Sequence, residues 1–470
     1  MQERKTIMDN NINTFFEKLK GKSVALCGVG VTNTPLAQML LEKGCKVTVC
    51  DKRSADKLGD VVEKLTSLGA TLKLGADYLE GLDVDVIFRT PGMSFYLPEL
   101  DAYRKKGVAI ISEMEVFFDL CPSHIIGITG SNGKTTTSTV IAEMLRADGK
   151  NVWLGGNIGK ALLPDIEKMK PEDWVVVELS SFQLISMRRS PDIAVVTNVS
   201  PNHLDMHKDM KEYVDAKRNI YRHQSGFGKL IVNADCPIAS SFVDGARGSC
   251  LAFSRMVMPS WGAYCGSDGA IWFSDRGVAR RIMRTADIKV PGMHNVENFL
   301  AAISAVGGIV SDEAIVNTAR SFSGVAHRAE LIRELDGVSW YNDSIATTPA
   351  RTIKGTLSLW QQKIILIAGG YDKKIPFDEL GPAVCDKVKT LILMGVTADK
   401  IEKTVRECRE FYSSGIEIVR VSNMEEAVKA AREKAVEGDI VSLSPACASF
   451  DMYPNFEARG DHFRSIVEAL

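Results

Sequence analysis

The architecture follows most directly from the stretch Ile125-Ile-Gly-Ile-Thr-Gly-Ser-Asn-Gly-Lys-Thr-Thr136. Its aliphatic start predicts a buried strand, and its end, Gly133-Lys134-Thr135, predicts a glycine-rich loop that opens a helix. The amides of such a loop cradle phosphate groups, the lysine reaches the outer phosphates and the hydroxyl binds Mg²⁺. Ile128 stands where the standard phosphate loop has its first glycine, so Gly130 makes a shorter motif. The order of strand, glycines, lysine and hydroxyl still favours a nucleotide site over a structural turn.

Short runs rich in Val and Ile alternate with helical stretches on both sides of this loop. The expected strands cover residues 23–27, 46–50, 84–89, 125–129, 174–178, 193–198, 230–233, 363–368, 390–394 and 440–443. Such alternation indicates parallel sheets flanked by helices, and therefore an α/β fold. The segment 236–290 differs, because Gly, Ser and aromatic residues occur there at close spacing. It predicts β-hairpins appended to the central unit.

Length and composition set the scale of the molecule. The chain has 470 residues, which exceeds the size of one hydrophobic core and favours two or three domains. A change of pattern at Cys121-Pro122 and a second one near 324–330 place the expected domains at 1–120, 121–325 and 326–470. With 45% hydrophobic and 25% charged residues, the composition excludes a disordered or fibrous chain.

Charge and cysteine content narrow the class of protein further. Lys and Arg number 57 and Asp and Glu number 59, so the net charge of -2 argues against a dedicated nucleic-acid binder. The 10 cysteines are scattered without a C-x-x-C pair, which suggests neither a disulfide framework nor a zinc ribbon. The polar N-terminus lacks the apolar core of a signal peptide, and the apolar run 299–310 is too short to span a bilayer. We expect a cytoplasmic protein with reduced thiols and no membrane span.

A second glycine turn, Gly28-Val-Gly30, directly follows the expected strand 23–27. Asp51 ends the next strand, so the geometry is Rossmann-like, with glycines that let a phosphate approach a helix N-terminus. The fingerprint is incomplete, because Asn33 stands at the third glycine position. A nucleotide-linked ligand is therefore favoured over NAD or a purely structural turn. Arg53 is placed to grip a diphosphate or uracil, unless it is an ordinary solvated arginine.

Three further features point to chemistry near the phosphate loop. Glu178 ends the expected strand 174–178, where a carboxylate can hold Mg²⁺; a helix-capping role is the alternative. The motif His203-Leu-Asp205-Met-His207, taken alone, fits a metal site, a proton relay or, most simply, a polar loop. Tyr213 and Lys217 lie four residues apart and so share one helical face, although a lysine on a helix surface is normally just solvated.

Several polar motifs occur at predicted strand ends, loops and helix starts, where ligand contacts concentrate in α/β proteins. They are Gly292-Met-His294-Asn-Val-Glu-Asn298, His327-Arg328, Tyr341-Asn-Asp-Ser344, Gly369-Gly-Tyr-Asp-Lys373 and Ser444-Pro-Ala-Cys-Ala-Ser449. Each alone is compatible with a turn or a helix cap. Their meaning comes from their joint order.

In this order the motifs resemble those of the Mur ligases, the ATP-dependent amino-acid ligases of peptidoglycan synthesis. The resemblance is carried by TGSNGKTT (129–136), ELSSFQL (178–184), NVSPNHLDMH (198–207) with AK (216–217), PGMHNVEN (291–298), AHR (326–328), NDS (342–344) and SPACASFD (444–451). It covers essentially the whole chain. The SPACASFD and NFEARG motifs and the GGYDKK loop look most like those of the members that add D-glutamate to UDP-N-acetylmuramoyl-L-alanine.

The resemblance implies three domains: a Rossmann-like N-terminal domain for the UDP-sugar, a central P-loop ATPase-type domain, and a Rossmann-like C-terminal domain that brings the amino acid. It implies that ATP phosphorylates the substrate carboxylate and that the amine of D-glutamate attacks the acyl phosphate, with release of ADP and phosphate. Such a reaction depends on positioning and charge neutralisation. It further implies two Mg²⁺ ions, small-molecule substrates as the only partners, and a monomer.

The family motifs also imply a role for individual residues. ATP is expected at Gly130, Ser131, Asn132, Gly133, Lys134, Thr135, Thr136, Asn295, Asn298, Arg328 and Asp343. Mg²⁺ is expected at Thr135, Glu178, His203 and Lys217, the last as a carbamate, and Lys134, Glu178, His203 and Lys217 are the expected catalytic residues. The UDP-sugar is expected at Val31, Thr32, Arg53, Thr90, Pro91, Gly92, Asn157 and His203. D-glutamate is expected at Thr347, Lys373, Ser449 and Phe456.

This chain departs from the family pattern at Ile345, where the pattern has a lysine that faces phosphate. Either Arg351 or Lys354 substitutes for that cation, or the C-terminal domain contributes less charge. The motifs leave open a sister ligase with another amino acid, a folylpolyglutamate synthase, or a non-catalytic paralogue that binds ATP and a UDP-sugar. An NAD-linked dehydrogenase rests only on the first glycine turn and the acidic residue that follows it.

Overall fold

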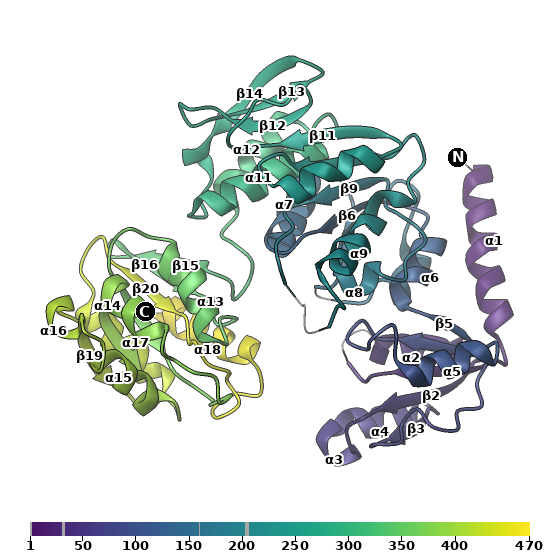
Figure 1. Cartoon of the computed structure of the whole chain (residues 1–470), viewed down its shortest axis with the longest axis horizontal. Coiled ribbons are helices and arrows are strands. Elements are labelled where there is room, and N and C mark those ends of the chain that lie inside the picture. The colour runs from purple at the N-terminus through teal and green to yellow at the C-terminus, as the bar shows by residue number, and fades with distance from the viewer. Residues whose placement is uncertain (1, 31–32, 159, 203–205) are drawn as a thin grey trace. The chain divides into compact units, whose positions relative to one another are not determined.

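The computed structural model describes residues 2–30, 33–158, 160–202 and 206–470. The chain forms two compact units: one extends to Asp287 and includes Val296–Ala319, and the other comprises Ile288–Asn295 and Arg320–Leu470. Each unit is built on parallel sheets with helices between the strands, which confirms the predicted α/β class (Figure 1). All ten cysteines are free thiols. Within the described residues, no helix combines the length and the apolar character needed to cross a membrane.

The first unit begins with a five-stranded parallel sheet in the order β3-β2-β1-β4-β5. Its strands are β1 (Ser23–Cys27), β2 (Lys46–Asp51), β3 (Thr71–Leu74), β4 (Val86–Arg89) and β5 (Ala109–Ile111), and its helices are α1 (Gln2–Leu19), α2 (Asn33–Glu42), α3 (Ala55–Leu58), α4 (Asp60–Ser67), α5 (Pro98–Lys105) and α6 (Glu113–Leu120). Leu26 packs in one core and Cys27 in the other, because successive strand residues point to opposite faces. The strand order reverses between β1 and β4, which is where ligands bind in sheets of this type.

The first unit continues with a six-stranded parallel sheet in the order β11-β10-β9-β6-β8-β7. Its strands are β6 (His124–Thr129), β7 (Val152–Gly156), β8 (Trp174–Glu178), β9 (Ile193–Val196), β10 (Lys229–Asn233) and β11 (Ser249–Phe253). Its helices are α7 (Lys134–Ala147), η1 (Leu163–Lys168), α8 (Ser181–Leu184), α9 (Met210–Arg222), α10 (Pro237–Ser240), η2 (Ser241–Gly245), and, further along the chain, α12 (Asp312–Ser321). Strand β6 lies between β8 and β9, so the loop that follows it is flanked by the ends of both neighbours.

The segment 236–290 is only partly the hairpin region that the sequence predicts. Strands β12 (Gly262–Cys265), β13 (Ala270–Asp275) and β14 (Val278–Arg284) do form an antiparallel sheet, followed by η3 (Thr285–Asp287). The part before them is different, because β11 pairs in parallel with β10 and extends the central sheet. The amide of Ala252 donates to the Trp261 carbonyl at 2.9 Å, so the hairpins continue from the edge of that sheet (Figure 1). The prediction of hairpins throughout 236–290 is therefore wrong for β11.

The second unit contains a six-stranded sheet in the order β15-β16-β20-β17-β18-β19, in which only the β15–β16 pair is antiparallel. Its strands are β15 (Glu330–Leu335), β16 (Val338–Asn342), β17 (Ile364–Ala368), β18 (Val388–Leu393), β19 (Glu417–Arg420) and β20 (Ile440–Leu443). Its helices are α13 (Pro349–Lys354), η4 (Thr356–Ser358), α14 (Leu380–Lys387), α15 (Ala398–Arg406), α16 (Phe411–Ser414), α17 (Met424–Lys434) and α18 (Phe456–Ala469). Helix α11 (Met293–Val306) begins in this unit and continues in the first.

Gly127, in the middle of strand β6, lies in a tightly packed part of the central sheet. A Cβ atom at Gly127 would lie 2.7 Å from Cγ of Pro191 and 3.3 Å from Cδ1 of Leu179. We expect Gly127→Ala to lower the free energy of unfolding by about 1–3 kcal/mol, because the added methyl group overpacks a buried core. Urea denaturation followed by circular dichroism measures the change. Gly226→Ala is the control, since its nearest neighbouring atom would be 4.0 Å away; equal stability of the two variants would contradict the packing.

Candidate functional site

The glycine loop between β6 and α7 is fixed by its own backbone conformation and by the end of β9. Gly130 has a φ of 155° and Gly133 a φ of 79°, values that favour glycine. The Thr197 hydroxyl donates to the Asn132 carbonyl at 2.6 Å, and the Asn132 amide donates to Oδ1 of Asn198 at 2.9 Å. A Cβ atom at Gly130 would overlap the Thr197 side chain. The loop therefore has the shape and the rigidity of a phosphate cradle.

Two predicted nucleotide residues begin helix α7 at the end of this loop. The Lys134 ammonium group donates to the carbonyls of Gly130 at 3.0 Å and Ser131 at 3.2 Å, so it lies over the loop itself. The Thr135 hydroxyl donates to Oε2 of Glu178 at 2.7 Å. Both side chains thus lie at the helix N-terminus, whose partial positive charge favours bound anions.

Glu178 is the residue on which the loop and the neighbouring strand ends converge. It ends β8, its exposed fraction is 2%, and its other oxygen, Oε1, accepts a hydrogen bond from Nδ2 of Asn157 at 2.8 Å. The structure therefore brings together Thr135 and Glu178, predicted as metal ligands, and Asn157, predicted on the sugar side. Carboxylate, hydroxyl and amide oxygens are the donors that Mg²⁺ prefers, so this set fits the ion. No group of three or more His, Cys, Asp or Glu side chains suited to a metal occurs in the described residues.

Lys217 is not the solvated lysine that its helical position would normally produce. It lies on α9 with an exposed fraction of 2%, and its Nζ donates to the Gly130 carbonyl at 2.9 Å and to Oγ1 of Thr129 at 3.4 Å. Burial lowers the pKa of Lys217 well below its usual value, and the Lys134 charge lowers it further, whereas the Glu178 charge opposes the shift. An amine in this environment gives up its proton readily and becomes a nucleophile toward small electrophiles.

The H-x-D-x-H motif is only partly described, because residues 203–205, and with them the predicted ligand His203, lie outside the described residues. His207 is buried, with Nε2 at 2.9 Å from the Ser181 hydroxyl and Nδ1 at 3.3 Å from Glu212, and its ring stacks on Phe182 at 5.1 Å. Tyr213 lies on the same face of α9 as Lys217, as predicted. Its ring centre is 4.7 Å from the Lys217 Nζ, and its hydroxyl is 2.9 Å from that of Ser131.

The asparagines predicted near adenine occupy different surroundings. Asn298 is buried, and its Oδ1 accepts a hydrogen bond from the Thr137 hydroxyl at 3.3 Å. A Cβ atom at Gly133 would overlap this side chain, so Asn298 supports the glycine loop from the helix α11 side. Asn295 belongs to the second unit, where its Nδ2 donates to the Pro291 carbonyl at 2.6 Å. Thr136, the remaining loop residue, is buried in the first turn of α7.

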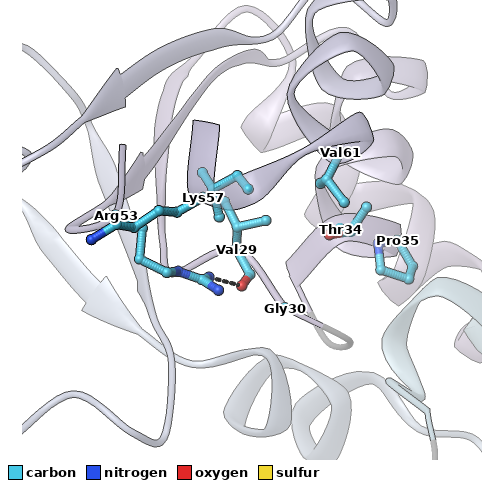
Figure 2. A pocket seen from close by; sticks show the side chains of 8 residues that line it. Val29, Gly30, Thr34, Pro35, Arg53, Lys57 and Val61 are labelled. Carbon is cyan, nitrogen blue, oxygen red and sulfur yellow. Dashed lines mark hydrogen bonds between the residues drawn. The ribbon is translucent and has the colours of Figure 1, made fainter. Parts of the chain in front are cut away.

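A pocket of about 420 Å³ lies at the carboxyl ends of β1 and β2 (Figure 2). It is lined by Val29, Gly30, Thr34, Pro35, Arg53, Lys57, Leu58 and Val61. Of the predicted UDP-sugar residues, Arg53 lines it, whereas Val31 and Thr32 lie outside the described residues. Lys57, Leu58 and Val61 were not predicted from the sequence, although their short helices closely follow Arg53 and carry a cation beside apolar residues.

Asp51 and Arg53 form an ion pair at the rim of this pocket. Nε of Arg53 donates to Oδ1 of Asp51 at 3.0 Å, and Nη2 donates to Oδ2 at 2.8 Å and to the Val29 carbonyl at 2.6 Å, as Figure 2 shows for the last bond. Burial would raise the pKa of Asp51, but hydrogen bonds from Arg53 and the Val29 amide outweigh it and hold the pKa at about 2. Both carboxylate oxygens are thus used within the protein, which argues against the ribose-binding role that an NAD site requires.

The incomplete glycine fingerprint has a structural explanation. Nδ2 of Asn33 donates to the carbonyls of Cys27 at 3.0 Å and Gly28 at 2.9 Å, so an amide side chain closes the turn where a glycine was missing. The predicted turn Thr90-Pro91-Gly92 follows β4 beside it. A Cβ atom at Gly28 would lie 3.0 Å from Cγ2 of Thr90, which places the two loops in contact.

In the second unit, two of the four residues predicted for D-glutamate line one small pocket. Thr347 and Lys373 lie there with Pro349, Tyr371, Ile375, Phe377, Ala446 and Cys447. Burial lowers the pKa of Lys373, and the charges of Arg351 and Arg459 lower it further. Ser449 is buried at 1% exposure, and its hydroxyl has no hydrogen-bond partner within the described protein. Phe456 begins α18, and its carbonyl accepts a hydrogen bond from Ser344 at 2.8 Å.

Asp343, predicted on the ribose side with Arg328, is engaged inside the second unit. Its Oδ2 accepts hydrogen bonds from the hydroxyls of Thr356 at 2.6 Å and Ser444 at 3.1 Å, and its exposed fraction is 5%. Burial raises the pKa of Asp343 to about 6, although these hydrogen bonds act in the opposite direction. At Ile345, the departure from the family pattern, the backbone carbonyl accepts a hydrogen bond from Nη1 of Arg351 at 3.2 Å.

Three family models match the chain, in chain order. Residues 22–112 match the model described as Mur ligase MurD-like, N-terminal domain. Residues 128–306 match the Mur ligase middle domain, and residues 327–447 match the Mur ligase, glutamate ligase domain.

Relatives of high identity match over nearly the whole chain. A protein of Acetivibrio thermocellus is 49% identical over 466 residues, which cover 98% of this chain and 100% of the relative. A protein of Clostridium botulinum strain Hall is 47% identical over 464 residues, with the same coverage. Each is named UDP-N-acetylmuramoylalanine--D-glutamate ligase.

Solved structures share the fold at low sequence identity. UDP-N-acetylmuramate-alanine ligase of Thermotoga maritima matches with a TM-score of 0.58 at 18% identity, covering 95% of this chain and 99% of that one. A UDP-N-acetylmuramoyl-L-alanyl-D-glutamate--2,6-diaminopimelate ligase matches with a TM-score of 0.55 at 19% identity, covering 97% and 93%. These likenesses support the architecture and not the substrate.

The pocket in Figure 2 leads to a prediction about Lys57. The charge of Arg53 is balanced by Asp51, so Lys57 supplies the additional positive charge that an anionic ligand would meet there. We expect Lys57→Met to weaken binding of UDP about threefold to tenfold, the effect of losing one charged contact near a surface. Isothermal titration calorimetry at low salt measures it.

Lys52→Met is the matched control, because Lys52 is exposed and adjacent to Arg53 but does not line the pocket. If Lys57→Met and Lys52→Met bind UDP equally well, Lys57 does not contact the ligand.

Proposed function

The chain belongs to the Mur ligase family, and from this premise we propose that it is an ATP-dependent ligase that joins D-glutamate to UDP-N-acetylmuramoyl-L-alanine in peptidoglycan synthesis. The observation that carries the proposal is the identity, over the full length, to relatives named for this activity. The expected division into domains near residues 120 and 326 is part of the proposal.

The proposed reaction has two steps. An oxygen of the substrate carboxylate attacks the γ-phosphorus of ATP, and ADP leaves, which produces an acyl phosphate. The amine of D-glutamate then attacks the acyl carbon, loses a proton and expels phosphate as the amide forms. The protein contributes alignment of the reacting groups and neutralisation of phosphate charge.

The glycine loop is proposed to hold the phosphates of ATP. Its amides lie at the N-terminus of α7, and the Lys134 ammonium group already lies over the loop, within reach of oxygens bound there. Thr135 and Glu178 are proposed to hold Mg²⁺, which would neutralise phosphate charge when bound. Asn157 supports this assignment, because its Nδ2 donates a hydrogen bond to the Glu178 carboxylate and so fixes the orientation of that carboxylate.

Lys217 is proposed to carry a carbamate. Its buried amine would attack CO₂ to form an N-carboxylate with loss of one proton, so that a cation becomes an anionic oxygen ligand. The low pKa of Lys217 supports this, because only the neutral amine reacts. The nearby Glu178 charge would repel the new carboxylate unless a cation lies between them, which is consistent with a Mg²⁺ site.

The remaining substrates are assigned by charge and position. We assign the UDP-sugar to the pocket of Arg53 and to the turn at Thr90, and the D-glutamate carboxylates to Lys373. We propose that Arg351, rather than Lys354, replaces the cation that is missing at Ile345. Arg351 donates a hydrogen bond to the Ile345 carbonyl, and its charge lowers the pKa of Lys373.

The test of the proposed function is phosphate release from ATP with UDP-N-acetylmuramoyl-L-alanine and a panel of amino acids. We expect release that depends on D-glutamate. Release with a different amino acid would indicate a sister ligase, and binding of ATP without release would indicate a non-catalytic paralogue; either result contradicts the proposal.

The carbamate leads to a separate prediction. Lys217→Ala should abolish most activity, because the anionic ligand is lost, and small carboxylic acids such as acetate should restore part of it by occupying the space of the side chain. The assay is phosphate release with increasing acetate. Lys211→Ala is the control, since Lys211 is an exposed lysine on the same helix. Full activity of Lys217→Ala without acetate would refute the role of Lys217.

A further inference from the structure

Arg89 is a buried cation that joins two parts of the first unit. It ends β4 with an exposed fraction of 3%. Nη1 donates to the carbonyls of Met93 at 2.8 Å and Thr90 at 3.4 Å, and Nη2 donates to the Phe182 carbonyl at 3.1 Å and the Ser186 hydroxyl at 3.4 Å. One side of the guanidinium therefore holds the 90–93 turn, and the other holds helix α8 and the residues after it.

The contacts of Arg89 are to neutral groups. Within the described part of the chain it forms no ion pair, and Ser186 lies between it and Glu115, to which Ser186 donates at 3.0 Å. Burial lowers the pKa of Arg89, which reflects the cost of removing the guanidinium from water. An apolar side chain would fill the space without that cost. Only the guanidinium supplies hydrogen bonds in fixed directions on both of its sides, two from Nη1 and two from Nη2.

Of the two parts that Arg89 joins, one belongs to the proposed UDP-sugar site and the other closely follows Glu178 of the proposed Mg²⁺ site. The 90–93 turn contains the residues assigned to the UDP-sugar. Helix α8 begins three residues after Glu178, and a capping box between Ser180 and Gln183 fixes its start. The Phe182 ring stacks on His207 with an interplanar angle of 6°, so the position of α8 also sets that of His207.

We propose that Arg89 is a positioning residue whose guanidinium fixes the sugar-nucleotide turn relative to helix α8 and hence to the Glu178 side of the nucleotide loop. This inference rests on the proposed function, since it assigns the turn to one substrate and the loop to the other. Phosphoryl transfer between two bound substrates requires that their reacting atoms be held about 3 Å apart. A loosened turn leaves each substrate bound but misaligned.

Two variants separate this role from simple stabilisation. Arg89→Met loses both sets of hydrogen bonds, and we expect its kcat to fall about 10- to 100-fold, the usual cost of misplacing a substrate by about 1 Å. The KM for ATP stays unchanged, because the glycine loop is not altered. Arg89→Lys keeps the charge but has a single ammonium group in place of the fork, so we expect it to fold like the wild type and still lose most of the kcat.

Arg104→Met is the matched control. Arg104 lies on α5, donates to the Phe95 carbonyl at 2.8 Å and stacks over the Phe95 ring at 4.6 Å, so it holds the same loop without a described contact to α8. We expect it to keep the wild-type kcat. Equal losses of kcat in the Arg104→Met and Arg89→Met variants, or full activity in both Arg89 variants, would overturn the proposal.

Hydrogen exchange with UDP as the probe tests the link without turnover. In the wild type and in Arg104→Met, UDP should slow exchange at residues 90–93 and in α8; in Arg89→Met or Arg89→Lys, protection should remain at 90–93 and be lost in α8. Persistent protection of α8 in the Arg89 variants would contradict the proposal. If the wild type binds UDP but shows no D-glutamate-dependent phosphate release, the proposed function fails, while this experiment still decides the role of Arg89.

Discussion

The hydrogen bonds that hold the glycine loop to the ends of β8 and β9 are the constraint on which the central site depends. The loop follows β6 at Gly130, whose φ is 155°. Thr197 and Asn198 form hydrogen bonds to it from one side, and on the other side the Thr135 hydroxyl donates to the Glu178 carboxylate. These contacts exist because parallel strands end at one edge of the sheet. Any movement of β8 or β9 would therefore displace the loop, the carboxylate and helix α7 together.

Electrostatics in this protein are local. The net charge of -2 provides no general attraction for anions, yet the proposed ligands are strongly anionic. The structure meets them with few cations, and of these Lys217 is buried in low-dielectric surroundings, where one charge acts more strongly than in water. Arg53 is balanced by Asp51, whereas Lys134, Lys217 and Lys373 lie where phosphate, Mg²⁺ or carboxylate groups are proposed. The lowered pKa values of Lys217 and Lys373 show that burial already disfavours their charge.

Most inner strands of the sheets were predictable because they are buried on both faces and therefore read as unbroken aliphatic runs, but the inner strand β16 was not predicted. Strands β3, β5, β7, β15 and β19 lie at sheet edges, where half-exposed side chains weaken the pattern, and they were not predicted from the sequence. Strand β11 was read as part of a hairpin because Gly, Ser and aromatic residues are closely spaced in 236–290. Asn33 was interpreted as a missing glycine in an incomplete motif. In the structure its side-chain amide donates hydrogen bonds to the carbonyls of Cys27 and Gly28 and so stabilises the turn.

The motifs by themselves determined the α/β class, the glycine loop that opens a helix at Lys134 and Thr135, and the set of residues from which a site could be built. These features are local, because strand, loop and helix are adjacent in the chain. Only the tertiary structure decided that Asn157 and Thr135 share one carboxylate, that Lys217 is buried over the loop, and that Arg89 reaches α8. Those contacts join residues 21 to 93 positions apart, so burial and hydrogen bonding there depend on the packed fold and leave no periodic signal in the sequence.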